Sequence, residues 1–154
     1  MSLIEKRLKE IGLVLPSAPS PMANYVACLQ VNNVVYTSGS TCFMDGKPLY
    51  TGRLGTDLTT DQGYEAAKIT VLNLISIIKA EIGDLDRIEQ IIKVLGLVSS
   101  AQDFYEQAQV INGASDLLVD VFGERGKHTR SALGTSVLPF NFPVEIEMIV
   151  QLKT

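Results

Sequence analysis

The last part of the chain has the clearest alternation of apolar and polar positions. From residue 143 to residue 152, aliphatic side chains at every second position alternate with a set that includes Glu145 and Glu147. This period of two predicts a β-strand, because successive side chains of a strand point to opposite faces. We therefore expect the two glutamates on one face and the aliphatic residues on the other.

A second strand is predicted at residues 127–138, and a short proline-bounded turn joins it to the last one. The same parity places Arg130, Ala132 and Gly134 on one of its faces. If the two strands are neighbours in a sheet, the arginine and the two carboxylates can share a surface, and the small residues leave room beside them. This surface would be an anion pocket, and we expect the rest of the chain to be its scaffold.

The N-terminal part combines helical spacing with prolines. Leu3 and Leu8 lie among charged residues and predict a short amphipathic helix over residues 1–12, which Gly12 ends. Three prolines then make residues 13–24 an extended connector, because proline at this density cannot continue a helix or a central strand.

Two turn signals follow the connector. Asn32-Asn33 lies between β-prone runs and predicts a two-residue hairpin, since asparagine tolerates a positive φ. Asp45-Gly46 marks a second turn, after which residues 49–54 are expected to form a short edge strand.

A long helix is predicted to begin at Thr59. Thr59 and Gln62 fit a capping box, the apolar residues that follow have 3.6-residue spacing, and Gly83 suits the position after the last turn. The next stretch, residues 88–98, is a nearly continuous apolar run, which is typical of a strand covered on both faces.

A second helix is predicted from an Asp103 cap to Gly123. Asn112-Gly113 within it would indicate a hairpin elsewhere, but its flanks have helical periodicity. We therefore predict one continuous helix with a weak point at this dipeptide.

This order of elements predicts a single α+β domain over residues 1–154, a two-layer sandwich with two long helices on one face of a sheet. No helix is left for the other face, which we expect to carry Arg130, Glu145 and Glu147 beside small and apolar residues. Self-association, most simply in a closed ring, would bury that face.

Composition narrows the class of protein. The chain has 154 residues, a net charge of −4 and a pI near 5.0, which weighs against a nucleic-acid partner. Cys28 and Cys42 are too few for a disulfide framework, and with a single histidine a His/Cys zinc site is close to excluded. We expect neither metal nor cofactor. No apolar segment has the length of a signal peptide or a membrane span, so we expect a cytoplasmic protein without a membrane partner.

Several motifs in the chain resemble those of the Rid/YjgF family, the reactive imine and enamine deaminases also known as L-PSP endoribonucleases. In order, they are Tyr25, YTSGS at 36–40, HTRSA at 128–132, LP at 138–139 and VEIEMIV at 144–150. The arginine–serine strand followed by LP and VEIE is the specific part. The resemblance implies a chorismate-mutase-like fold with a mixed sheet, assembled as a homotrimer with its sites in the clefts between subunits.

The resemblance also implies roles for individual residues. In active relatives the arginine that matches Arg130 binds the carboxylate of a 2-imino acid, and the glutamate that matches Glu145 helps to position the hydrolytic water. The residues expected to line the substrate site are Tyr25, Ser38, Gly39, Asn112, Ser131 and Ala132. Ala132 stands where many deaminases of the family have a cysteine, and an extra N-terminal helix and a longer second helix resemble a longer subgroup.

Structural interpretations of the same residues stay open. Arg130 would then only form ion pairs with Glu145 or Glu147, and Glu147 is expected to serve the subunit interface. The side chains of Ser38, Asn112 and Ser131 can equally satisfy backbone groups. His128 is expected to be a loop or interface residue.

The leading functional hypothesis is a hydrolase that converts reactive 2-imino and enamine acids to 2-keto acids and ammonia. The alternative is a non-catalytic trimer that binds a small carboxylate metabolite. A ribonuclease has the least physical support, because the chain is acidic and has no pair of histidines. The sequence leaves the side chain of the substrate open, and also whether Ala132 abolishes turnover.

Overall fold

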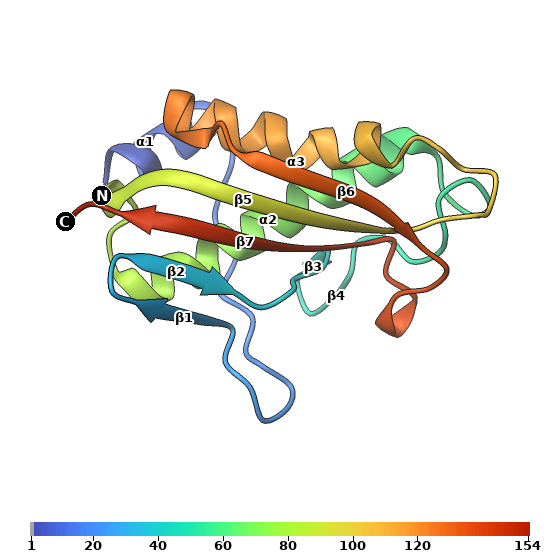
Figure 1. The fold of residues 1–154 in the computed structure, drawn as a ribbon, viewed down its shortest axis with the longest axis horizontal. Helices are drawn as coiled ribbons and strands as arrows, with labels where there is room; N and C mark the ends of the chain where they lie inside the picture. Colours follow the sequence, from blue (N-terminus) through green and yellow to red (C-terminus); the bar gives the residue numbers. More distant parts are fainter. Residues whose placement is uncertain (1) are drawn as a thin grey trace.

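The apolar faces of two long helices and a five-stranded sheet meet in one core layer (Figure 1). The strands of this sheet are β1 (Cys28–Val31), β2 (Val34–Thr37), β5 (Ile88–Ser99), β6 (Thr129–Thr135) and β7 (Val144–Leu152). The helices are α1 (Leu3–Glu10), α2 (Thr60–Ile82) and α3 (Gln107–Phe122). Short elements complete the chain: β3 (Phe43–Met44), β4 (Lys47–Pro48) and 3₁₀ turns at Leu85–Arg87, Gly123–Gly126 and Pro139–Asn141.

The structure is a computed structural model that describes residues 2–154. The sheet has the order β1-β2-β7-β5-β6, in which β5 and β6 run parallel and the other neighbours run antiparallel. Helix α2 contacts β1, β2 and β7, and α3 contacts β5 and β6, so both helices cover the same face. The predicted α+β sandwich with a mixed sheet is confirmed. None of the helices in residues 2–154 is both long and apolar enough to cross a membrane.

Helix α2 begins and ends where its sequence signals predict. The Thr59 side chain accepts a hydrogen bond from the Gln62 backbone N–H, and the Gln62 side chain accepts one from the Thr59 N–H, which completes the capping box. Gly83 ends the helix with a φ of 81°. Residues 70–78 of α2 are all buried, and the helix packs both against the sheet and against its neighbour α3.

Helix α3 begins three residues later than predicted: its N-cap position is Glu106, and Asp103 does not cap it. The backbone before it is engaged elsewhere: the Ala101 N–H donates to the Leu54 carbonyl, and the Phe104 N–H donates to Ala101 in a turn. Asn112-Gly113 lies inside one continuous helix, as predicted. A Cβ at Gly113 would lie 2.1 Å from the Tyr64 carbonyl oxygen, so this glycine is a point of close approach between α3 and α2.

Both predicted turns are present, but the predicted edge strand is not. Asn32 adopts a φ of 54° in the hairpin between β1 and β2. Asp45-Gly46 joins β3 to β4, so the residues that pair after this turn are Lys47–Pro48. Residues 49–54 form no strand, and Leu54 makes only isolated bridges.

The expected pairing of the last two strands is wrong, because β5 lies between β6 and β7. β5 is 12 residues long, is largely apolar and pairs with β7 on one side and with β6 on the other. The turn at Pro139–Asn141 therefore belongs to a connection that passes β5 rather than to a hairpin. The sheet's open face has no helix over it within residues 2–154 and exposes the apolar side chains of Leu29, Val31, Tyr36 and Leu133.

Candidate functional site

Arg130 and the two glutamates lie on opposite faces of the sheet. Residues paired across neighbouring strands share a face, and Arg130 pairs with Val94, which pairs with the buried Met148 on the helix side. Glu145 pairs instead with Leu97 on the open face. The expectation that these residues share a surface is therefore wrong. Which residues of β6 and β7 share a face depends on the intervening strand β5 and on the register of its pairing with both strands. Alternation along a single strand reveals neither the strand order nor the register.

The guanidinium of Arg130 reaches from the edge strand β6 to α3. Its Nη1 donates hydrogen bonds to Asn112 Oδ1 at 2.8 Å and to Ser115 Oγ at 3.1 Å. These two α3 residues are three positions apart, so they lie on the same face of the helix. The Nε and Nη2 groups have no acceptor, and no carboxylate lies within 4.0 Å, among residues 2–154. The ion pair with Glu145 or Glu147, the structural alternative for Arg130, is thus not formed within residues 2–154, and three N–H groups remain to bind an anion.

His128 extends the hydrogen-bond network that begins at Arg130 and Ser115. His128 Nε2 lies 2.9 Å from Ser115 Oγ, and His128 Nδ1 lies 2.6 Å from the Gly126 carbonyl oxygen. Burial lowers the pKa of His128, and the nearby charge of Arg130 lowers it further, although the contact with Gly126 acts in the opposite direction. The lowered pKa favours the neutral form of the imidazole. Ser115 was not predicted as a site residue; its spacing of three residues from Asn112 on one helix was the available signal.

Ser131 and Ala132, which follow Arg130 on β6, point to opposite faces of the sheet. Ala132 pairs with Gly96 and lies half-buried on the same face as Arg130, where it takes part in the core. Ser131 points to the open face and accepts a hydrogen bond from Lys93 Nζ at 3.2 Å. The structure therefore brings Asn112 and Ala132 to the side of Arg130 and leaves Ser131 on the other face.

A separate cluster forms around Glu145. The backbones of Ser40 and Ile146 exchange two hydrogen bonds, at 2.9 and 3.0 Å, which places Gly39 against Glu145. A Cβ at Gly39 would lie 2.2 Å from Glu145 Oε1, so only a glycine leaves the carboxylate in this position. Burial raises the pKa of Glu145, and the like charge of Glu147 raises it further. Glu145 is thus a half-buried carboxylate with increased basicity.

Ser38 connects this cluster to the segment that contains Tyr25. Its hydroxyl donates to the Val26 carbonyl at 2.6 Å, and its backbone N–H donates to the Ala27 carbonyl at 2.8 Å. The hydroxyl therefore satisfies a backbone group, as the structural interpretation of this serine predicts. The Tyr25 side chain is 52% exposed and is available to a partner.

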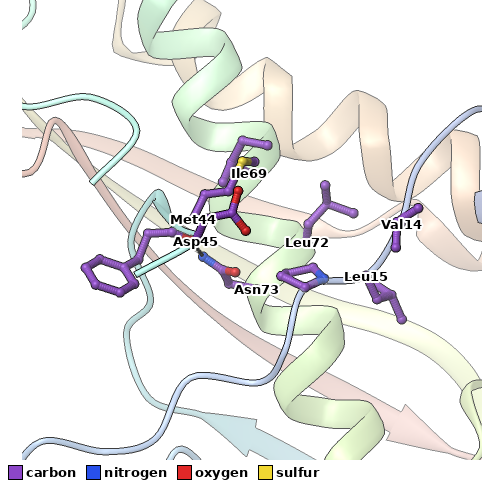
Figure 2. A pocket seen from close by; sticks show the side chains of 9 residues that line it. Val14, Leu15, Met44, Asp45, Ile69, Leu72 and Asn73 are labelled. Atoms are coloured by element: carbon purple, nitrogen blue, oxygen red, sulfur yellow. Dashed lines mark hydrogen bonds between the residues drawn. The ribbon is translucent and has the colours of Figure 1, made fainter. Parts of the chain in front are cut away.

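One hollow of the chain, about 270 Å³ in volume, is lined by residues that belong to neither cluster (Figure 2). It is bounded by the connector at Val14–Pro16, by α2 at Ile69–Asn73 and by β3. The Asn73 amide donates to the carbonyl oxygens of Thr41 and Phe43 at 2.9 and 2.7 Å, so it serves the backbone of the neighbouring loop. None of the site residues predicted from the sequence lines this hollow.

Comparison with known proteins agrees with the motifs. A family profile described as YjgF/chorismate mutase-like, putative endoribonuclease, matches residues 5–152. Protein TCP17 of Trypanosoma cruzi is 39% identical over 151 residues, which cover 97% of this chain and 94% of that protein.

Solved structures show the same fold. The protein Atu1372 of unknown function from Agrobacterium tumefaciens is 43% identical, with a TM-score of 0.92 over 97% of this chain and 92% of that one. A putative endoribonuclease from Shewanella oneidensis MR-1 is 36% identical, with a TM-score of 0.94 over 97% of this chain and 99% of that one. The profile match and these identities extend over nearly the whole chain, so this protein belongs to the YjgF/chorismate mutase-like family.

Proposed function

We propose that the protein hydrolyses the C=N bond of small 2-imino acids, and of the enamines in equilibrium with them, to give 2-keto acids and ammonia. One observation carries this proposal. Arg130 is anchored through Nη1 alone, and its Nε and Nη2 groups have no acceptor among residues 2–154. The side of the guanidinium formed by Nε and Nη2 matches the two oxygens of a carboxylate.

The chemistry needs orientation and a placed water more than a strong nucleophile. A charge-assisted contact between arginine and carboxylate contributes about 1.5–3 kcal/mol and fixes the substrate. The imine carbon is already electrophilic, so a water held by Glu145 can add to it. The water gives a proton to the carboxylate, which passes it to the nitrogen. The hydroxyl proton of the resulting carbinolamine then moves to the nitrogen, the C–N bond breaks, and ammonia leaves as the hydroxyl oxygen becomes the keto oxygen.

A single chain cannot present both groups to one small substrate. The strands of Arg130 and Glu145 are separated by β5 and lie about 10 Å apart; the two residues are also three positions apart along β5, and they point to opposite faces of the sheet. A second copy that packs its open face against the β6–α3 edge would bring its Glu145, Gly39 and Tyr25 toward the first copy's Arg130. The exposed apolar side chains of the open face support such packing, and we propose the closed ring of three that the family resemblance implies.

The test is ammonia release from freshly generated 2-iminobutyrate by the full chain. We expect a rate above the spontaneous one, and a loss in kcat/KM of about 10- to 100-fold in Arg130→Ala. Arg130→Lys is the matched control. It keeps the positive charge but lacks the paired N–H donors of the guanidinium, so its kcat/KM should lie between those of Arg130→Ala and wild type. If wild type and Arg130→Ala both match the spontaneous rate, the proposed reaction is wrong.

Sharing of the site between copies has its own test. Arg130→Ala and Glu145→Ala chains, each with strongly reduced activity alone, are unfolded together and refolded as a mixture. In a ring whose sites take one residue from each neighbour, about one quarter of the sites then have both native residues. A mixture no more active than its separate components would contradict a shared site.

A carboxylate-binding protein without turnover is the second candidate, because Ala132 replaces the cysteine of many deaminases and leaves the Arg130 fork intact. Saturable binding of 2-ketobutyrate that needs Arg130, without ammonia release, would favour it. The family description also includes endoribonuclease. RNA cleavage that survives purification and disappears in Arg130→Ala would support that activity instead.

A further inference from the structure

We infer that Ser115 and His128 are positioning residues for Arg130, which they hold so that its Nε–Nη2 edge faces the carboxylate of the substrate. This inference rests on the proposed function and adds two residues to it. Neither residue needs to touch the substrate. Both act through the hydrogen bonds that end at Arg130 Nη1.

The proton positions in this network follow from one carbonyl group. The Gly126 oxygen can only accept, so His128 Nδ1, which is 2.6 Å away, carries a hydrogen and donates it. In the neutral ring Nε2 is then the acceptor, and the Ser115 hydroxyl donates to it over 2.9 Å. The lone pairs of Ser115 Oγ remain for Arg130 Nη1 at 3.1 Å. Each hydrogen bond in the series therefore has a defined donor: Arg130 donates to Ser115, Ser115 to His128, and His128 to the Gly126 carbonyl. The lowered pKa of His128 agrees with a neutral ring.

The network uses both hydrogens of Nη1. One is donated to Asn112 and the other to Ser115, and because the guanidinium is planar, two anchored hydrogens fix the orientation of the whole group. A free arginine side chain loses rotamer entropy when it binds a ligand. An arginine that is already held loses less, so its affinity for a carboxylate is higher.

The frame behind His128 is rigid. A Cβ at Gly126 would lie 2.1 Å from the Leu118 carbonyl oxygen, so the turn packs directly against α3. Gln90 Nε2 donates to the Arg125 carbonyl at 3.1 Å, and Arg125 Nη1 donates to the Ile88 carbonyl at 2.7 Å, which ties the same turn to β5. The carbonyl that orients His128 is therefore fixed by two elements of the core.

The kinetic test compares paired substitutions in the full chain. Ser115→Ala should raise KM for 2-iminobutyrate about tenfold while kcat changes far less, because one contact to a charged group is lost. Ser115→Thr keeps the hydroxyl and should stay near wild type. His128→Leu should behave like Ser115→Ala, whereas His128→Gln, whose amide oxygen can accept from Ser115, should recover most of the affinity. Glu81→Ala, at an exposed position near the end of α2, is the control.

A second measurement separates this inference from the proposed reaction and from misfolding. Arginine side-chain ¹⁵N spectra report whether rotation of the guanidinium is restricted, and Arg130→Lys assigns the signal of Arg130. We expect distinct, slowly exchanging Nη signals in wild type, and averaged signals in Ser115→Ala and His128→Leu at unchanged thermal stability. A wild type without turnover would refute the reaction but not this restriction. An Arg130 signal and a KM that are the same in wild type and Ser115→Ala would overturn the inference.

Discussion

Substitution of Gly39 by alanine tests the contact on which the position of Glu145 depends. The added Cβ would lie 2.2 Å from Oε1, 2.9 Å from Cδ and 3.0 Å from Cγ of Glu145. Ordinary van der Waals contact begins at 3.4 Å, so the carboxylate must retreat by more than 1 Å, and moving the oxygen alone is not enough. Gly39 is not among the residues with positive φ, so alanine adds no backbone strain.

The expected effects follow from these distances. A side chain forced about 30° from its rotamer costs about 0.5–1.5 kcal/mol, and we expect the free energy of unfolding to fall by about that amount. A misplacement of about 1 Å in a catalytic group can lower the rate about 100-fold, so kcat for 2-iminobutyrate should fall by about that factor.

A double-mutant cycle with Glu145→Ala makes the prediction specific. If Gly39 acts only by leaving room for the carboxylate, Gly39→Ala should add little to Glu145→Ala, both in thermal denaturation and in ammonia release. Additive effects in the double mutant, or a Gly39→Ala protein with wild-type kcat and stability, would refute this reasoning. The stability arm of the cycle needs no assumption about the reaction.

Three further predictions concern stability. Gly113→Ala brings a Cβ to 2.1 Å from the Tyr64 carbonyl oxygen, a backbone atom, and should lower the free energy of unfolding by about 1–3 kcal/mol in urea titrations, whereas the exposed Gln109→Ala should not. Glu145→Gln should raise the melting temperature at neutral pH. The folded-state pKa of the Glu145 carboxyl is raised, so its charged form lowers the stability of the wild type above that pKa. The difference in melting temperature between variant and wild type should vanish as the pH falls below 4.5. A difference that grows on acidification would contradict it. Thr59→Ala removes the capping hydrogen bond of α2 and should lower stability by about 1 kcal/mol, without changing KM.

Local signals predicted the helix ends and turns well. Thr59 caps α2, Gly83 ends it, and Asn32 adopts the positive φ that its hairpin requires, because each of these features depends on a few neighbouring residues. The start of α3 was the exception. Asp103 is a good cap by composition, but contacts of the preceding backbone with Leu54 delay the helix.

The candidate site was only partly predictable, because its geometry depends on strand order. Alternation placed Glu145 and Arg130 correctly within their own strands, but not relative to one another, since no local pattern shows that β5 lies between them. The contact of Gly39 with Glu145 depends equally on pairing between distant segments. Ser115 was missed, and His128 was expected only as a loop or interface residue, for the same reason: the two come together only after α3 docks beside β6.

The placement of the arginine and the glutamate on opposite faces of one sheet has a consequence for how the protein would work in a cell. Under the proposed arrangement a newly made chain carries half of two different sites and completes neither. Specific activity should therefore fall on dilution, as copies separate, and rise again on concentration. The activity in a cell would then depend on the fraction of chains that have assembled as well as on the number of chains synthesised.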